Sequence, residues 1–353
     1  MLRKFLTLLL LFTGAIAFPQ LNTGTLLEEM TDMVRLAEYP SPGFETTQFS
    51  SYDRRSVAPD QPGWFGNADG FGGEPIPGFE EVLQEPGEDG VGKYLICDVA
   101  GPGAVVRLWT ARITGNLEVF IDGEEPALYS GPAQEFFYNT YDAIAGTEGV
   151  YNQEAIFWQN TAGYYPIPFE KRLRLVWEGK LKELHFYHVQ VRKYSPGTQI
   201  RSFSKDDLKS FSKEISGVQN ILTDPMGAIP PEGEKTVLSA LVDPGSSQPL
   251  GIIKGEKAIT TLSVRIRGVD MDRLLRQNIL KIRFDGASSA QVQSPVGDFF
   301  GAAPGINPYH SLPFSVLPDG TMICRFFMPF RDSVNLEIEN LGGSPAHVYA
   351  EVH

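Results

Sequence analysis

The sequence predicts an all-β protein made of two tandem jelly-roll β-sandwich domains that are related by internal duplication. From Lys93 onward, short β-like runs alternate with Gly, Pro and Asp turns, which is typical of antiparallel sandwiches. One motif occurs twice: a strand that ends in Asp-Gly, at Asp122 and again at Asp285, precedes a Phe-Phe pair by the same interval. Solenoid repeats span only about 20–50 residues, so a repeat of this length is a whole duplicated domain.

The first 17 residues predict an export signal. Arg3 and Lys4 are basic, Phe5–Phe12 is apolar, and Ala15–Ala17 has the small-x-small pattern of a cleavage site. The apolar run is shorter than the roughly 20 residues that a membrane-spanning helix needs. We therefore expect an exported protein, periplasmic or extracellular, with no membrane association after cleavage of residues 1–17.

Residues 18–90 predict a short helix followed by a long ordered loop. Apolar residues recur at helical spacing over 25–38, Thr25 and Glu28 can form a capping box, and Pro40 ends the pattern. Residues 40–92 are rich in Gly, Pro, Asp and aromatic residues and have little periodicity, which predicts an ordered loop over the β domains or a linker.

The two β domains are predicted over residues 91–195 and 251–353, with a linker over 196–250 that contains a short polar helix. Strands in both domains are read from apolar runs of four to eight residues. Within the first domain, Arg107 and Trp109 lie on an apolar strand. We interpret them as a core Trp beside an Arg at the edge of the sheet rather than as a site.

Charge and cysteine content limit the possible partners. The formal net charge is −13 and no Lys/Arg stripe is present, which argues against a nucleic-acid partner. Cys97 and Cys324 each lie in a strand-like run of a different repeat, so they are either buried free thiols or a disulfide formed in an oxidising compartment. Five scattered His and no C-x-x-C motif give no zinc signature, and we expect neither a metal nor a cofactor.

The densest polar and aromatic cluster lies in the predicted loop, between residues 50 and 70. A carboxylate, a guanidinium, an amide and aromatic rings are the groups that bind sugars, because planar polar groups pair with hydroxyls while rings stack on C–H faces. The alternative is that the Asp and Arg residues only hold a long loop in place. The residues predicted to bind substrate here are Tyr52, Asp53, Arg54, Trp64, Asn67 and Asp69.

Asp298 is the candidate for the opposite side of the same binding surface. It lies between Gly297 and a Phe pair, where a short acidic side chain at a strand end can contact a ligand. The alternative is a turn-forming Asp whose carboxylate accepts backbone N–H groups. No nucleophile elbow, Walker loop or H-E-x-x-H motif is present anywhere in the sequence.

Several motifs resemble those of domain-of-unknown-function family 2961, whose characterised members form glycoside hydrolase family 172. The resemblance spreads from about residue 50 to the end of the chain. The matching segments are Ser51–Arg54, Gly66–Gly70, Gly101–Gly103 leading into Arg107–Trp109, Phe284–Gly286, Pro295–Gly301 and Met328–Phe330.

This resemblance implies jelly-roll domains, a carbohydrate partner, oligomers with intersubunit sites, and retaining cleavage of fructofuranosyl or arabinofuranosyl linkages by two Glu residues. The two family segments that carry these Glu residues, Gly-Glu-Gly-[Asp/Glu] and Gly-Thr-Gly-[Thr/Ser]-Glu-Asp-Tyr-Phe, are absent from the sequence. Retaining cleavage needs both carboxylates. We therefore expect a chain cut short before its catalytic module and inactive alone; the alternative is a non-catalytic carbohydrate-binding or structural tandem jelly roll.

Overall fold

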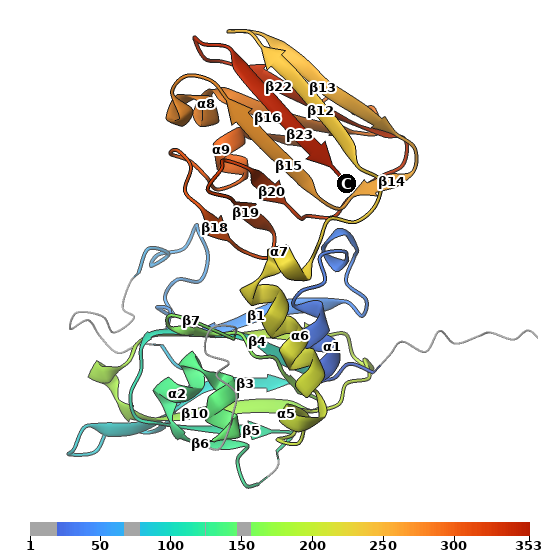
Figure 1. Ribbon diagram of the computed structural model, residues 1–353. Coiled ribbons are helices and arrows are strands. Elements are labelled where there is room, and N and C mark those ends of the chain that lie inside the picture. The colour runs from blue at the N-terminus through green and yellow to red at the C-terminus, as the bar shows by residue number, and fades with distance from the viewer. Residues whose placement is uncertain (1–19, 67–77, 124, 147–156) are drawn as a thin grey trace, which may run out of the picture.

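The structure, a computed structural model, describes residues 20–66, 78–123, 125–146 and 157–353. It consists of two antiparallel β-sandwiches joined by a helical segment (Figure 1). The predicted all-β tandem sandwich fold is confirmed. The predicted export signal lies outside the described residues, and none of the helices described is long and apolar enough to cross a membrane.

The first sandwich is formed by two sheets, here called A1 and B1. Sheet A1 has the order β1-β11-β4-β8-β7, with β9 also paired to β4, and sheet B1 has the order β2-β3-β10-β5-β6. Two short helices, α2 (Ala133–Tyr138) and α3 (Thr140–Ala145), follow β6. The strands are β1 (Phe44–Ser50), β2 (Glu81–Gln84), β3 (Val91–Ala100), β4 (Gly103–Arg112), β5 (Asn116–Ile121), β6 (Tyr129–Pro132), β7 (Trp158–Gln159), β8 (Ala162–Gly163), β9 (Ile167–Phe169), β10 (Arg172–Lys180) and β11 (His185–Tyr194).

The second sandwich is formed by sheets A2 and B2. Sheet A2 has the order β12-β23-β15-β20-β19-β18, sheet B2 has the order β13-β22-β16-β17, and β14 pairs with β21 alone. Helices α8 (Met271–Gln277) and α9 (Val296–Phe299) lie between strands. The strands are β12 (Thr236–Val242), β13 (Ser247–Lys254), β14 (Lys257–Ile259), β15 (Leu262–Arg267), β16 (Asn278–Phe284), β17 (Val292–Pro295), β18 (Tyr309–His310), β19 (Phe314–Val316), β20 (Met322–Cys324), β21 (Met328–Phe330), β22 (Ser333–Asn340) and β23 (Ala346–Val352).

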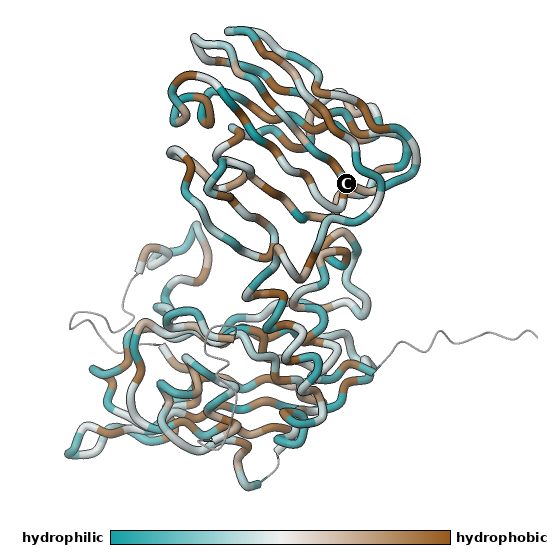
Figure 2. Tube along the Cα trace, viewed as in Figure 1, coloured by the Kyte–Doolittle hydropathy of each residue, from teal (hydrophilic) through white to brown (hydrophobic). Residues whose placement is uncertain are grey.

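The two sandwiches share one topology, which supports the duplication read from the sequence. The order β3-β10-β5-β6 in sheet B1 matches β13-β22-β16-β17 in sheet B2, and β1-β11-β4 in A1 matches β12-β23-β15 in A2. Hydrophobic and hydrophilic residues alternate along many of these strands (Figure 2), and β22 alternates buried and partly buried positions over its whole length. This period of two is what a strand with one face on a core requires.

The duplicated Asp-Gly turn makes the same contacts in both sandwiches. Asp122 and Asp285 adopt left-handed backbone conformations, with φ of 58° and 54°, which Asp tolerates better than most residues. The Asp122 carboxylate accepts hydrogen bonds from the backbone N–H groups of Lys171 (2.6 Å) and Arg172 (3.2 Å). The Asp285 carboxylate accepts from those of residues 331–333, at 3.0, 2.7 and 3.2 Å. Each turn is thereby fixed to the start of the neighbouring strand of the same sheet.

The Phe pairs that follow these turns lie on a short helix or, for Phe300, directly after one. Phe136 and Phe137 of α2 are both buried, whereas in the second copy Phe300 is fully buried and Phe299 is half-buried. If the pair lay on a strand, one ring would point away from the core, which is not what the first sandwich shows. The reason is that a helical turn at the edge of the sheets, unlike a strand, can place two consecutive side chains in the same core.

Each sandwich has its own hydrophobic core. Trp177 is the largest fully buried side chain of the first core, and Phe300 is the largest fully buried side chain of the second. Cys97 belongs to the first core and Cys324 to the second, and both are buried free thiols. The disulfide alternative does not occur, because the two sulfur atoms lie in different cores.

The helix and loop boundaries at the N-terminus differ from the prediction. Helix α1 spans Thr23–Glu29, capped by Asn22, and only a 3₁₀ turn, η1 (Arg35–Ala37), follows it. Asn22 takes the capping role because its side-chain oxygen accepts from the Thr25 N–H while Thr25 Oγ1 accepts from the Asn22 N–H. Strands β1 and β2 come from the predicted loop, and β12 and part of β13 come from the predicted linker.

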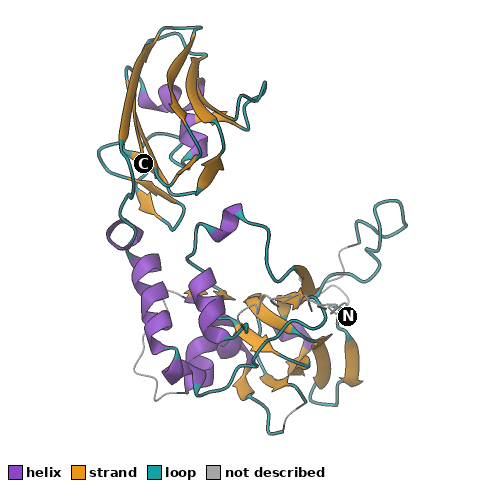
Figure 3. Cartoon of the chain, turned by 90° about the vertical axis from the view of Figure 1, so that its right-hand side faces the viewer, coloured by secondary structure: helices purple, strands orange, loops and turns teal. Residues whose placement is uncertain are grey.

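The segment between the sandwiches is helical. It contains α5 (Asp207–Ser210), α6 (Ser212–Thr223) and α7 (Pro225–Ala228), and α6 packs on α1 beside the first sandwich (Figure 3). Arg325 of the second sandwich is 3% exposed and donates to the Met226 sulfur of α7 as well as to Ser315 Oγ. This buried guanidinium joins the helical segment to the second sandwich.

Replacing Phe300 by Ala is expected to destabilise the second sandwich by about 3–5 kcal/mol, because the ring is fully buried in its core. Urea unfolding followed by intrinsic fluorescence and circular dichroism measures the change. Phe65→Ala is the control, since Phe65 is 93% exposed and should leave the midpoint unchanged. An unchanged midpoint for Phe300→Ala would contradict the placement of this core.

Asp285 is expected to make the second sandwich sensitive to acid. Hydrogen bonds from the backbone N–H groups of Asp332 and Arg331 lower the pKa of this carboxyl below its usual 3.8. A lowered pKa gives a stabilising contribution that is present above about pH 4 and is lost as the pH falls through the folded-state pKa. Asp285→Asn should therefore flatten the fall of the urea midpoint between neutral and acid pH. Asp272→Asn, an exposed position on α8, is the control and should keep the wild-type slope.

Candidate functional site

The outer face of sheet A1 is divided into a covered half and an open half. The covered half holds a small separate hydrophobic cluster. In it, Leu26 of α1 and Leu21, which precedes α1, pack with Ala104, Tyr194 and Ile200. The open half lies further along β1, β11 and β4. Figure 1 shows that sheet A1 is the layer of the first sandwich that faces the second sandwich.

Two rows of side chains cross this open half. The strand register places Ser50, His188 and Trp109 in one row, and Gln48, Gln190 and Arg107 in the next. The alternate residues of β11, Tyr187, Val189 and Val191, are buried in the core below. We call the open surface formed by Gln48, Arg107, Trp109, Tyr164, His188 and Gln190 the Trp109 face.

Trp109 is half-exposed on this face, so its interpretation as a core Trp is wrong. Leu108 and Thr110, its neighbours on β4, are the residues that point into the sandwich. The Trp109 ring instead lies 4.8 Å from the ring of His188, centroid to centroid, at an interplanar angle of 44°. A partly exposed indole ring held by a second ring is a flat platform for an apolar ligand surface.

The other groups of the Trp109 face are fixed by neighbouring side chains. The Gln190 amide nitrogen donates to the Gln48 side-chain oxygen at 2.9 Å. The Arg107 guanidinium lies 6.0 Å from the centre of the Tyr164 ring, a cation–π arrangement. Burial and, second, the nearby charge of Arg107 lower the pKa of His188, so its imidazole is neutral at neutral pH. The face thus combines aromatic rings, amides and one guanidinium.

The predicted loop begins directly after β1 and the first part of it is well anchored. Asp53 is 7% exposed and accepts from Arg55 through its backbone N–H (3.0 Å), Nε (3.0 Å) and Nη2 (2.5 Å). Arg54 donates to the Ser50 carbonyl at 2.8 Å and to Glu80 at 2.9 Å, and its guanidinium covers the Tyr52 ring at 4.0 Å. These contacts are those of the alternative interpretation, in which Asp53 and Arg54 hold the loop in place.

The exposed rings of the predicted site are Tyr52, which is 49% exposed, and Trp64, which is 38% exposed. Tyr52 lies two residues after Ser50, the last residue of β1. Asn67 and Asp69 lie outside the described residues, and the predicted common cleft of this loop stays a prediction.

Asp298 belongs to the second sandwich, on α9. Its carboxylate is ion-paired with Arg276 of α8, with a distance of 2.6 Å from Arg276 Nη1 to the Asp298 Oδ2 atom. Figure 1 places α8 and α9 within the second sandwich, while the loop that carries Tyr52 leaves the first. The described contacts of Asp298 are thus with its own sandwich and not with Tyr52, Asp53 or Arg54.

The residues of the Trp109 face were not among the sequence candidates, although a signal for them exists. Strand β11 alternates polar residues at 188, 190 and 192 with apolar ones at 187, 189 and 191, which predicts a polar outer face. What the sequence lacks is the pairing of β11 with β1 and β4. No group of three or more His, Cys, Asp or Glu residues that could bind a metal occurs in the described part of the chain.

Comparison with models of known protein families shows which family the chain belongs to. A model described as the GH172 first β-sandwich domain matches residues 42–211, and one described as GH172 domain-like matches residues 233–350. The chain belongs to the GH172-like family. The two matches cover the two sandwiches in turn, so the family resemblance seen in the motifs is confirmed over both. A search of curated proteins gave no match.

Similarities to solved structures are weak. The major capsid protein P2 of bacteriophage PM2 is 8% identical with a TM-score of 0.21, covering 78% of this chain and 94% of that one. Two CBM32 domains of Clostridium perfringens ZmpB, in complex with GalNAc, are 8% identical with a TM-score of 0.20, covering 92% and 94%. A variant oxalate decarboxylase of Bacillus subtilis is 12% identical with a TM-score of 0.16, covering 74% and 68%. These scores are too low to support a conclusion about function.

Arg107 is expected to contribute to the lowered pKa of His188. In Arg107→Gln the charge beside the imidazole is gone while the burial stays, so the His188 pKa should rise part of the way towards its usual 6.5. A pH titration of the His188 ring protons by NMR measures this pKa. Arg273→Gln, on α8 of the second sandwich, removes an equal charge elsewhere and should leave the titration unchanged.

Proposed function

We propose that this GH172-like protein is an exported carbohydrate-binding protein that holds a neutral, furanosidic saccharide on the Trp109 face. The observation that carries this proposal is the half-exposed Trp109 ring, fixed against His188 and bordered by two amides and a guanidinium. Rings of this kind stack on the C–H face of a sugar, and planar amide and guanidinium groups pair with its hydroxyls.

The furanosidic nature of the ligand comes from the family, whose resemblance implies fructofuranosyl or arabinofuranosyl linkages. The neutral character comes from the face itself. Only Arg107 among its six residues carries a formal charge, and His188 is neutral at neutral pH. The hydroxyl oxygens of an uncharged sugar can accept hydrogen bonds from the Arg107 guanidinium, and the face has no second charge that the sugar would cover.

Binding without cleavage is the activity that this face supports. Retaining hydrolysis needs two carboxyl groups about 5–5.5 Å apart on either side of the scissile bond. The Trp109 face contains no Asp or Glu among its described residues. Hydrolysis by the chain alone is the second candidate, supported by the family match, and it would require a carboxylate pair from elsewhere.

The test is binding of arabinofuranosyl and fructofuranosyl oligosaccharides to the purified mature chain, measured by isothermal titration calorimetry. Trp109→Ala should weaken binding by about thirtyfold or more, since truncating a central aromatic residue of a binding site costs roughly 2 kcal/mol. Leu341→Ala is the control, because Leu341 is 62% exposed and lies between β22 and β23 of the second sandwich.

Trp64→Ala separates this proposal from the loop prediction. If Trp64→Ala removes binding and Trp109→Ala does not, the sugar lies on the loop. If the wild-type chain binds none of the furanosidic oligosaccharides, the proposed function is wrong. Release of reducing sugar by the isolated chain would show hydrolysis and overturn the proposal of binding alone.

A further inference from the structure

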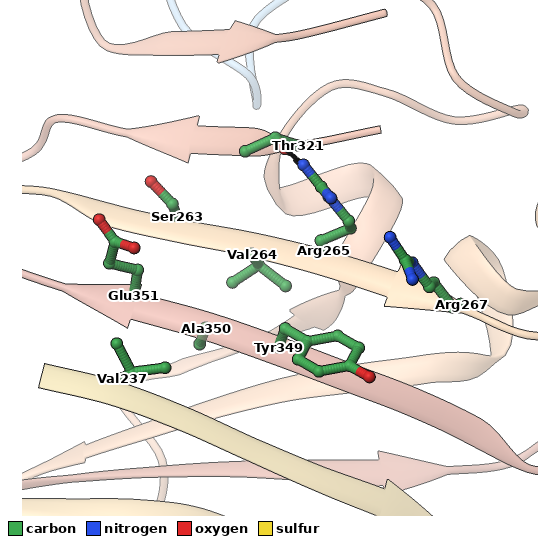
Figure 4. A pocket seen from close by; sticks show the side chains of 9 residues that line it. All are labelled: Val237, Ser263, Val264, Arg265, Arg267, Thr321, Tyr349, Ala350 and Glu351. Carbon is green, nitrogen blue, oxygen red and sulfur yellow. Dashed lines mark hydrogen bonds between the residues drawn. The ribbon is translucent and has the colours of Figure 1, made fainter. Parts of the chain in front are cut away.

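The outer face of sheet A2 carries an open groove with a volume of about 370 Å³, which the proposed function does not use. Figure 4 shows that its lining comes from strands β12, β15 and β23, together with Thr321, which directly precedes β20. Its volume lies within the range of about 300–1,000 Å³ that is usual for small-molecule sites. A2 corresponds in topology to A1, so the groove occupies the layer equivalent to the one that carries the Trp109 face.

Neighbouring strands bring aromatic and cationic side chains together in this groove. The register places Tyr349 beside Arg265, His347 beside Arg267, and Glu351 beside Ser263. Val264 and Ala350, which alternate with these residues, are buried in the core. The polar members therefore share the outer face.

One end of the groove is cationic. Thr321 Oγ1 accepts hydrogen bonds from Arg265 Nε at 3.1 Å and Nη2 at 2.6 Å, and Asp319 forms an ion pair with the same guanidinium. Arg265 is thus held in position, and the Asp319 carboxylate balances its charge. Arg267 is exposed and lies 5.8 Å from the centre of the Tyr349 ring, and it has no ion-pair partner in the described part of the chain. Its guanidinium has donors available to a ligand.

The floor of the groove is the Tyr349 ring. The ring is 37% exposed, and a hydrogen bond of 3.0 Å joins its hydroxyl to His347 Nδ1. Fixing the hydroxyl in this way restrains the ring, so less side-chain entropy is lost when a flat ligand stacks on it.

At the other end of the groove the Glu351 carboxylate is ion-paired. The Glu351 carboxylate accepts from Lys235 Nζ at 2.5 Å and from His353 Nε2 at 2.9 Å, and the Ser263 hydroxyl lies beside it across the strands. Because Lys235 matches the charge of Glu351, a ligand carboxylate is attracted to Arg267, which has no ion-pair partner in the described part of the chain. The groove thus orients an anionic ligand along the row from Glu351 to Arg267.

We propose that this groove is a second, independent binding site, which takes an acidic oligosaccharide containing a uronic acid residue. The uronate carboxylate pairs with the Arg267 guanidinium, whose planar fork fits a carboxylate in a bidentate manner. The sugar ring stacks on Tyr349, and its hydroxyls reach Ser263 and Glu351. The site lies on the other sandwich and does not depend on the proposed function of the Trp109 face.

The experiment compares trigalacturonate with its fully methyl-esterified form, by isothermal titration calorimetry on the full chain at low and moderate salt. The ester keeps the sugar skeleton and removes the negative charge, so it should bind at least about tenfold more weakly. Arg267→Gln should weaken binding of the acid by a similar factor and abolish the preference for acid over ester. Arg267→Lys keeps the charge without the fork and should fall between the two.

Arg273→Gln is the matched control, because Arg273 is an exposed arginine of the same sandwich outside the groove, and it should bind the acid like the wild type. Trp109→Ala should also keep this binding, which separates the two sites. Equal affinity for acid and ester, or wild-type affinity in Arg267→Gln, would overturn the proposal. The proposal would also be overturned if the chain did not bind trigalacturonate but self-associated, and if Tyr349→Ala removed that self-association.

Discussion

The two sandwiches depend on one contact that each of them repeats, the hydrogen bonding of an Asp carboxylate to the backbone that begins a neighbouring strand. Asp122 fixes the end of β5 to the start of β10, and Asp285 fixes the end of β16 to the start of β22. About 46–50 residues of chain lie between the bonded groups. Because the carboxylate closes this long loop at the sheet itself, the intervening helices and short strands can differ between the copies while the B sheets keep their order.

Closing the B sheets in this way leaves the outer faces of the A sheets free to diverge. In the first copy α1 covers one half of the face, and the remainder holds Trp109, His188 and two Gln side chains. In the second copy the open groove lies along β12, β23 and β15, and two Arg side chains border the Tyr349 ring. The same layer thus presents a nearly neutral surface in one copy and a cationic end in the other.

Most of the fold could be predicted from the sequence, because local sequence patterns determine it. The period-two strands, the Asp-Gly turns and their repetition give the tandem sandwich directly. The site could not be predicted to the same degree, because it depends on which strands pair. Trp109 has apolar neighbours and reads as a core residue, and only the pairing of β4 with β11 places its ring outside. Asp53 and Arg54 have the functional groups of a sugar site, but these groups are bonded within the protein. Asp53 accepts from Arg55, and Arg54 donates to Glu80 and to the Ser50 carbonyl.

Because the two faces differ in charge, salt and the overall field of the protein should affect ligand binding to them differently. Stacking on Trp109 and hydrogen bonds to neutral amides involve one formal charge at most, so salt should affect binding there little. A carboxylate on the exposed Arg267 is an ion pair near the surface, which salt screens over a Debye length of about 8–10 Å. In a chain whose net charge is −13, an anionic ligand also approaches against the overall field. Recognition of an acidic sugar therefore has to come from the local geometry of Arg267 and Tyr349, which is why the proposed site needs both groups.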